Sequence, residues 1–121
     1  MRPLLQTELK SFLKRFNDFK DGEFRALDII TPQNISLTFA LQDAARSHDW
    51  ITLTLNFNEV VDAKLLTNNQ LSYLDINDGF SLLFDESSFA FALGECYNSS
   101  SAKNATLYII AKSIKYEEGI F

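Results

Sequence analysis

Residues 35–42 read Ile-Ser-Leu-Thr-Phe-Ala-Leu-Gln, and residues 51–58 read Ile-Thr-Leu-Thr-Leu-Asn-Phe-Asn. Large apolar residues alternate with smaller, mostly polar residues in both segments, which is the pattern of a β-strand that buries one face. The opposite face carries no charge, which is unusual for a surface that has only to stay hydrated, although Thr and Ser also suit an ordinary exposed strand. This uncharged face is the first candidate for a binding surface, and its candidate contacts are Ser36, Thr38, Thr52, Thr54 and Asn56.

Further period-two segments flank this pair along the chain. Thr31 to Asn34, with Pro32, forms a turn signal before it, and residues 59–66 continue extended or bend into another strand. Asp78-Gly79 is a strong hairpin signal. Residues 98–104, rich in Ser and Asn, are predicted to be the most flexible loop. We predict strands over residues 24–30, 35–42, 50–58, 73–76, 80–84, 89–93 and 105–116.

An amphipathic helix of about four turns is predicted before the first strand. Its apolar residues recur at helical spacing: Leu5, Leu9, Phe12, Leu13, Phe16 and Phe19. Pro3 suits the first turn, and Gly22 is placed to end the helix in a left-handed conformation. A membrane-surface or partner-binding helix has a similar pattern, but a sheet with one apolar face needs a cover, so we expect the helix to dock on the sheet.

The short connections between the predicted strands determine the fold class. Connections of two to eight residues cannot join parallel neighbours, which need a dozen residues or more. We therefore predict a single α+β domain over residues 1–121, a curved antiparallel β-meander of six to seven strands with the N-terminal amphipathic helix packed on its concave face. Eleven Phe residues supply the rings for its core.

Composition excludes several classes of protein. The chain has 121 residues and a net charge of −5, which argues against nucleic-acid binding. A single cysteine excludes an intramolecular disulfide. The N-terminus becomes charged too early for a signal peptide, and no apolar run approaches the length of a membrane span. We therefore expect a cytoplasmic protein that contacts neither nucleic acid nor membrane.

Catalytic and metal-binding patterns are weak. The side chains of Ser47-His48-Asp49 diverge and cannot align as a hydrolase triad, although a nucleophile from elsewhere, such as Cys96, is an alternative to plain turn and core roles. Asp75 to Gly79 resembles a calcium loop with broken spacing, so the turn interpretation is preferred. We expect no enzyme activity, no catalytic residue, no cofactor and no metal.

Two further surfaces are candidates for contact with a partner. Acidic residues gather near turns, above all Asp85 and Glu86, and these carboxylates are either solvated turn residues or part of a rim that meets a basic partner. Ala90, Ala92 and Gly94 form a strip of small residues on one strand face. This strip is either an internal packing site or half of a homodimer contact.

The passage from Asp78-Gly79-Phe80 through Leu83-Phe84-Asp85 to residues 108–117, Tyr-Ile-Ile-Ala-Lys-Ser-Ile-Lys-Tyr-Glu, resembles small bacterial proteins of the polymorphic-toxin immunity type. The likeness covers about the last third of the chain, rests on strand rhythm and the closing segment, and includes no catalytic motif. It implies a stoichiometric binder that covers the active surface of a toxin, with an acidic rim suited to a basic nuclease.

These observations favour a non-enzymatic intracellular protein-binding module, most concretely an immunity-type inhibitor of a bacterial toxin. The alternative is a small-molecule or lipid-binding protein with an aromatic-lined cavity under the curved sheet. A third class is an enzyme that uses carboxylates without a sequence signature.

Overall fold

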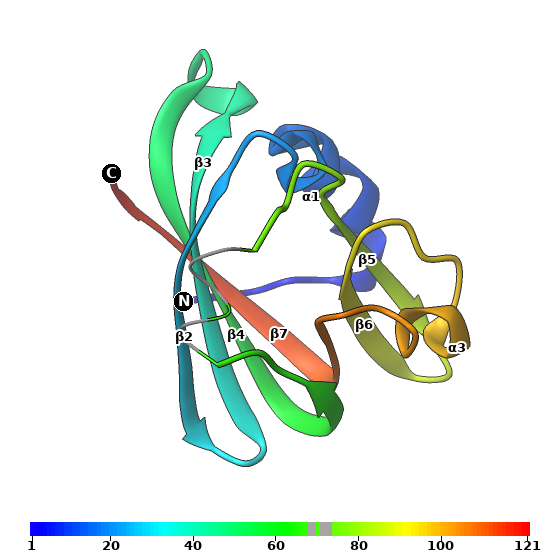
Figure 1. Ribbon diagram of the computed structural model, residues 1–121. Coiled ribbons are helices and arrows are strands. Elements are labelled where there is room, and N and C mark those ends of the chain that lie inside the picture. Colours follow the sequence, from blue (N-terminus) through cyan, green and yellow to red (C-terminus); the bar gives the residue numbers. More distant parts are fainter. Residues whose placement is uncertain (68–69, 71–73) are drawn as a thin grey trace.

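The computed structural model describes residues 1–67, 70 and 74–121 (Figure 1). The chain begins with β1 (Arg2–Pro3), a 3₁₀ turn (Gln6–Glu8), α1 (Leu9–Arg15) and a second 3₁₀ turn (Asn17–Phe19). The other described elements are β2 (Glu23–Thr31), β3 (Asn34–Asp43), a 3₁₀ turn (Ala44–Arg46), β4 (Asp49–Lys64), β5 (Phe80–Asp85), β6 (Ser88–Leu93), α3 (Ser99–Ala102) and β7 (Tyr108–Ile120). Among these described residues, no helix is long and apolar enough to cross a membrane.

The strands form one seven-stranded antiparallel sheet in the order β2-β3-β4-β7-β6-β5, with β1 paired to β7. The predicted α+β class and antiparallel sheet are confirmed. The order departs from one uninterrupted meander because the chain leaves β4 and returns at the far edge with β5. Tyr108 to Ala111 at the start of β7 are all buried, as expected for a strand in the middle of a sheet.

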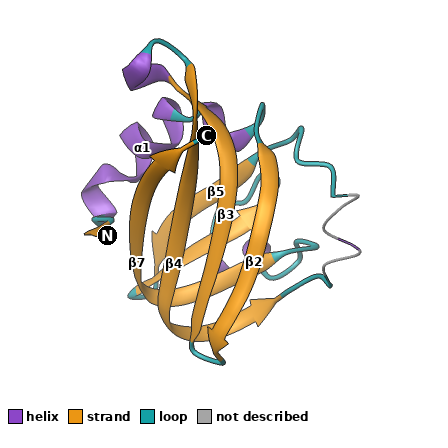
Figure 2. Cartoon of the chain, turned by 90° about the vertical axis from the view of Figure 1, so that its left-hand side faces the viewer, coloured by secondary structure: helices purple, strands orange, loops and turns teal. Residues whose placement is uncertain are grey.

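The sheet bends so that β5 and β6 pass behind the layer of β2, β3, β4 and β7 (Figure 2). Helix α1 packs on the inner, concave side of this bend (Figure 1), as predicted. The rings of the N-terminal segment meet those of the sheet: the centroids of Phe12 in α1 and Tyr116 are 5.1 Å apart, and those of Phe19 in the following 3₁₀ turn and Phe39 are 5.0 Å apart. Within the sheet, Phe80 stacks on Phe91 at 4.6 Å. Aromatic packing of this kind stabilises the core beyond simple burial.

The N-terminal helix is shorter than predicted. Pro3 pairs with Lys115 of β7 and does not occupy a first helical turn. Helix α1 ends at Arg15, because Asn17, Asp18 and Phe19 all adopt positive φ angles of 53°, 54° and 67°. This turn directs Phe19 into the core, where it is fully buried. Burial of the Phe19 ring in the core therefore outweighs the helical spacing that predicted a longer helix.

Gly22 does not take the left-handed conformation predicted for it. A Cβ atom at this position would clash with Leu41 Cδ2 and would lie 3.0 Å from the Ala40 carbonyl oxygen. The glycine therefore allows a close approach between the N-terminal segment and β3.

Two segments between the strands differ from prediction. Leu74 to Ile76 do not form a strand, and Tyr73, the first residue of the strand predicted over 73–76, lies outside the described residues. The turn itself is present, since Gly79 N donates to the Ile76 carbonyl (2.8 Å). The predicted flexible loop 98–104 contains α3, because the Asn98 side chain accepts a hydrogen bond from Ser101 N (2.8 Å) and caps the helix.

Candidate functional site

The five predicted contact residues lie together on one sheet face. Ser36 pairs with Asn56, Thr38 with Thr54, and Ala40 with Thr52. Since alternate residues share a face, these side chains occupy neighbouring rows on the side of β3 and β4 away from the core. We call this the outer face, the side of β2, β3, β4 and β7 that carries them. In Figure 2 it faces the viewer, and the described helices and β5 lie behind it.

The polar side chains of the outer face bond to one another. Asn56 Nδ2 donates to Asn34 Oδ1 and to Ser36 Oγ, each at 2.8 Å, and Asn58 Nδ2 donates to Asn56 Oδ1 at 2.7 Å. The hydroxyls of Thr38 and Thr54 are 3.2 Å apart. Because many of these groups already have partners, covering them costs less than burying free polar groups.

Charged residues flank the uncharged rows. Lys115 and Glu117 of β7 pair with Asn56 and Thr54, and Asp28 of β2 pairs with Ser36. The outer face is thus uncharged over residues 34–42 of β3 and 50–58 of β4, and it is charged on the strands to either side. Sequence reasoning missed this arrangement, because it depends on the register between strands that are distant in the chain.

An aromatic cluster lies at the C-terminal end of β7. The rings of Trp50 and Phe121 are 5.6 Å apart, and the guanidinium carbon of Arg25 lies 5.2 Å from the Phe121 ring centroid. Trp50 is 38% exposed and Phe121 is 62% exposed. Trp50 shares the outer face with Thr52 and Thr54 by strand alternation. Sequence reasoning missed Arg25 and Phe121, because only the folded sheet brings them to Trp50.

The predicted acidic residues are spread over separate places. Asp85 Oδ2 accepts a hydrogen bond from Ser99 N (2.9 Å), so this carboxylate holds the start of α3. Glu86 is exposed in the β5–β6 turn with a φ of 53°. Asp78 precedes β5 and Asp85 ends it, so these two acids lie at opposite ends of the strand.

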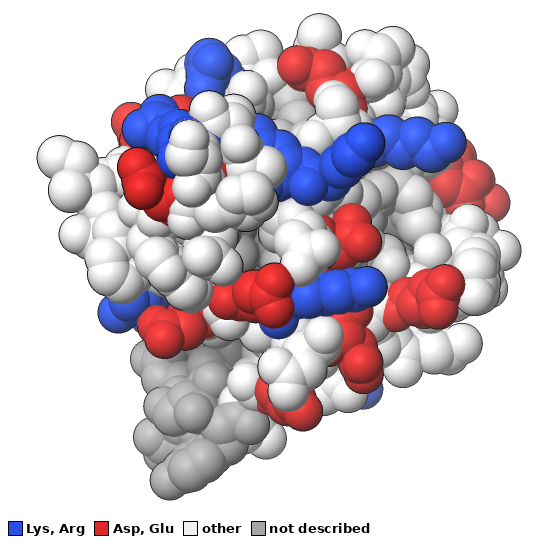
Figure 3. Space-filling model, turned by 90° about the horizontal axis from the view of Figure 1, so that it is seen from above, with Lys and Arg blue, Asp and Glu red and all other residues white. Residues whose placement is uncertain are grey.

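Glu118 belongs to a cluster of ion pairs that joins α1 to the sheet. Arg15 Nε donates to Asp43 Oδ1 (2.7 Å), Arg15 Nη2 donates to Asp43 Oδ2 (2.6 Å), and Arg15 Nη2 also lies 2.6 Å from Glu118 Oε1. Arg46 Nη2 lies 2.6 Å from Glu118 Oε2. Basic and acidic groups are accordingly close together on this end of the molecule (Figure 3). The cluster is a structural clamp, with its charges paired internally.

The clamp changes the ionisation of its acids. Hydrogen bonds from Arg15 hold the pKa of Asp43 below its ordinary value, although burial of this carboxylate opposes the shift. Burial would raise the pKa of Glu118, but hydrogen bonds and charges from Arg15 and Arg46 lower it overall.

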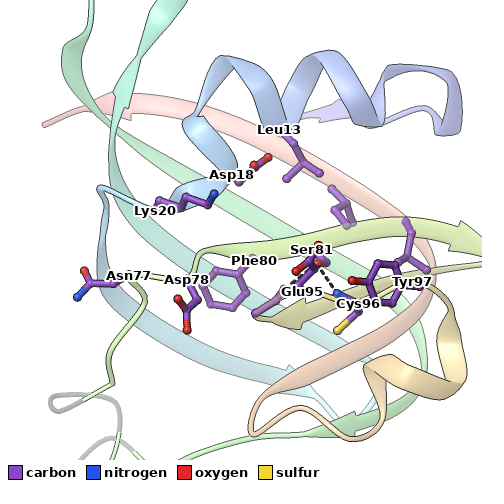
Figure 4. A pocket seen from close by; sticks show the side chains of 13 residues that line it. Leu13, Asp18, Lys20, Asn77, Asp78, Phe80, Ser81, Glu95, Cys96 and Tyr97 are labelled. Atoms are coloured by element: carbon purple, nitrogen blue, oxygen red, sulfur yellow. Dashed lines mark hydrogen bonds between the residues drawn. The ribbon is translucent and has the colours of Figure 1, made fainter.

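A groove of about 870 Å³ lies beside β5 (Figure 4). Leu13, Asp18 and Lys20 line one side, and residues 94–97 line the other. Ser81 Oγ donates to the Gly94 carbonyl (2.6 Å) and accepts from Cys96 N (2.9 Å), which fixes the second wall. We call this the β5 groove.

The weak catalytic candidates are not brought together. His48 lies in the turn before β4 with a φ of 65°, in a different pocket from Cys96, which lines the β5 groove. Burial raises the pKa of the Cys96 thiol, which disfavours the thiolate needed for nucleophilic attack. In the described part of the chain, no three His, Cys, Asp or Glu side chains gather as a metal site.

Two of the three small residues form an internal packing site, whereas Gly94 is half-buried and lines the β5 groove. Ala90 and Ala92 are almost fully buried and pack with Ala102 of α3 and with Tyr108 and Ile110 of β7. A homodimer contact through Ala90 and Ala92 is therefore wrong, because both side chains are buried.

The space on the concave side between α1 and the sheet is filled with packed rings: Phe12, Phe16, Phe19, Phe39, Phe80 and Phe91.

Comparisons of the chain with family models, with curated proteins and with solved structures found no match. The function is therefore inferred from the surfaces of this molecule, together with the resemblance of its last third to immunity-type proteins.

Proposed function

We propose that this chain is a non-enzymatic protein-binding module that contacts a protein partner through its outer face. The observation that carries the proposal is the uncharged, internally hydrogen-bonded rows of β3 and β4 on the outside of the sheet, where Thr38, Thr52 and Thr54 are half-buried and Ser36 and Asn56 are buried beside them. A surface of this kind loses little hydration when a second protein covers it.

The arrangement of the outer face also matches the anatomy of protein interfaces. The centre of an interface is depleted of charge, while its rim is polar and charged. Trp and Arg are the residue types that most often carry binding energy. Trp50 and Arg25 lie at one end of the uncharged rows, and both contact Phe121.

The partner is proposed to be basic and intracellular, most concretely a bacterial toxin domain that this protein inhibits by covering its active surface. The net charge of −5 favours association with a basic partner. The resemblance of the last third of the chain to immunity-type proteins supports the same class.

The proposal is tested by capture of the tagged protein from a lysate of its own host, followed by titration with the purified partner. We expect a basic protein bound in a one-to-one complex. Thr38→Arg and Thr54→Arg place a long charged side chain in the uncharged rows and should weaken binding at least about tenfold. Ser100→Arg, on the exposed side of α3, is the matched control and should bind as the wild type does.

The proposal fails if no stoichiometric partner is recovered, or if the recovered partner binds both outer-face variants with unchanged affinity. Thermal unfolding of each variant establishes that a loss of binding does not reflect a loss of folding.

A further inference from the structure

The two edges of the sheet differ in how they are protected. The edge strand β2 carries Glu23, Arg25 and Asp28, and two register shifts interrupt its pairing with β3. The edge strand β5 pairs with β6 over six unbroken positions and has no charged residue before Asp85. Charges and bulges protect edge strands against pairing with another chain. In these respects β2 is protected and β5 is open.

The free side of β5 presents the backbone groups of Leu82 and Phe84. Gly94 N donates to the Gly79 carbonyl (2.8 Å), so Phe80 and Leu93 form a pair without mutual backbone hydrogen bonds. Such pairs alternate with hydrogen-bonded ones along an antiparallel ladder, so the N–H and C=O groups of Leu82 and Phe84 point away from β6. Among the described residues, no backbone group bonds to them on that side.

The β5 groove lies along this free edge, and the charged side chains that line it are mainly acidic. The groove follows Phe80 to Leu83 and runs between the N-terminal segment and residues 94–97 (Figure 4). Among the described residues that line it, Asp18, Asp78 and Glu95 are acidic and Lys20 is the one basic residue. Three carboxylates beside one ammonium group favour a positively charged occupant.

We propose that β5 binds an extended, Lys- or Arg-containing segment of a partner protein, which pairs with the edge as an additional strand. Main-chain hydrogen bonds to Leu82 and Phe84 supply the register, and the carboxylates of the groove select for positive charge. A second copy of this chain fits less well, because symmetric pairing would bring the acidic grooves and two chains of net charge −5 together. The site lies apart from the outer face, so its test is independent of that surface.

The probe is an eight-residue synthetic peptide of alternating Lys and Val, added at millimolar concentration to the ¹⁵N-labelled full chain. We expect the amide signals of Leu82 and Phe84 to shift and their hydrogen exchange to slow, while amides of β2 remain unchanged. The matched peptide of alternating Glu and Val should not bind. A Lys-Val peptide with a methyl group on every backbone nitrogen should also fail, because it cannot donate hydrogen bonds to the ladder from either of its edges.

Phe84→Pro removes one outward N–H at an exposed edge position, where proline is tolerated. Phe84→Val keeps the N–H and loses the same ring, so it is the matched control. We expect Phe84→Pro to bind the Lys-Val peptide at least about fivefold more weakly than Phe84→Val. The proline removes one hydrogen bond to the peptide and also hinders the close approach of the peptide backbone to β5. Thermal unfolding and the dispersion of the amide signals report whether both variants are folded.

Absence of binding, equal binding of the Glu-Val peptide, or shifts confined to β2 or the outer face would overturn the proposal. So would sedimentation of the wild-type chain as a dimer that Phe84→Pro dissociates, because the occupant of β5 would then be a second copy. If Phe84→Pro does not fold, the methylated peptide decides the same question on the wild-type chain: its binding with unchanged affinity contradicts strand pairing.

Discussion

Replacement of Asp43 by Asn should destabilise the protein strongly. The Asp43 side chain is fully buried and accepts hydrogen bonds from both Arg15 Nε and Arg15 Nη2, as well as from Ala45 N. Breaking a buried ion pair costs about 3 to 5 kcal/mol, because one charge is left without its partner. Arg15 keeps Glu118 and is partly exposed, so we expect the lower end, about 3 kcal/mol.

A loss of this size corresponds to a decrease of roughly 10 °C in Tm for a chain of this length. The effect should also depend on pH. The pKa of Asp43 is lowered in the folded state, so its contribution is fully present above the ordinary carboxyl pKa of about 4. The contribution disappears as the pH falls through the lowered folded pKa, so the difference between wild type and Asp43→Asn should shrink below about pH 4.

Urea unfolding at pH 7 and at several values below pH 4 measures both effects. Asp28→Asn is the matched control, because it makes the same substitution at an exposed position of β2 and should change stability by less than about 0.5 kcal/mol. A loss below about 1 kcal/mol for Asp43→Asn, or a loss that is the same at every pH, would refute the role assigned to the clamp.

Three further substitutions test the packing by urea unfolding. Phe39→Ala should cost about 3 to 5 kcal/mol, because Phe39 is fully buried among other rings, and a cost near zero would contradict the described core. Gly22→Ala should cost about 1 to 3 kcal/mol, since the new methyl group would overlap Leu41; an unchanged midpoint would show that the close approach is absent. Asn98→Ala should cost about 1 kcal/mol through loss of the α3 cap, and Asn98→Ser should restore most of it.

Both bounds of β3 and the start of β4 could be predicted to within one residue from the sequence, whereas β4 continues past the predicted end at residue 58 to Lys64. Residues 35–42 lie within β3, and residues 50–58 lie within β4, because one face of each buries Leu, Ile and Phe. The same alternation placed Ser36, Thr38, Thr52, Thr54 and Asn56 on one face, and the register of β3 with β4 confirms that they are neighbours.

Features that depend on distant pairings could not be predicted in the same way. The insertion of β7 between β4 and β6 follows from the β4–β7 register and not from any local pattern. The early end of α1 reflects the demand of the core for Phe19. The Asn98 cap uses the same residue types as a loop, so composition alone favoured the wrong structure there.

The outer face was only half predicted. Its uncharged residues are local in the sequence, but the contact of Arg25 and Trp50 with Phe121 joins β2, β4 and the residue that follows β7. The β5 groove likewise combines residues from the N-terminal segment, β5 and the segment after β6. Such sites have no sequence signature because no single spacing encodes them.

The single tryptophan provides the most direct test of the outer face as the partner-binding surface. Trp50 lies on that face and is 38% exposed, so a 5-fluorotryptophan label gives one ¹⁹F signal from the surface in question. We predict that the purified protein partner shifts this signal and shields it from a soluble paramagnetic quencher, and that Thr54→Arg reduces both effects while Ser100→Arg does not. A stoichiometric complex in which the Trp50 signal keeps its position and its access to the quencher would contradict the account.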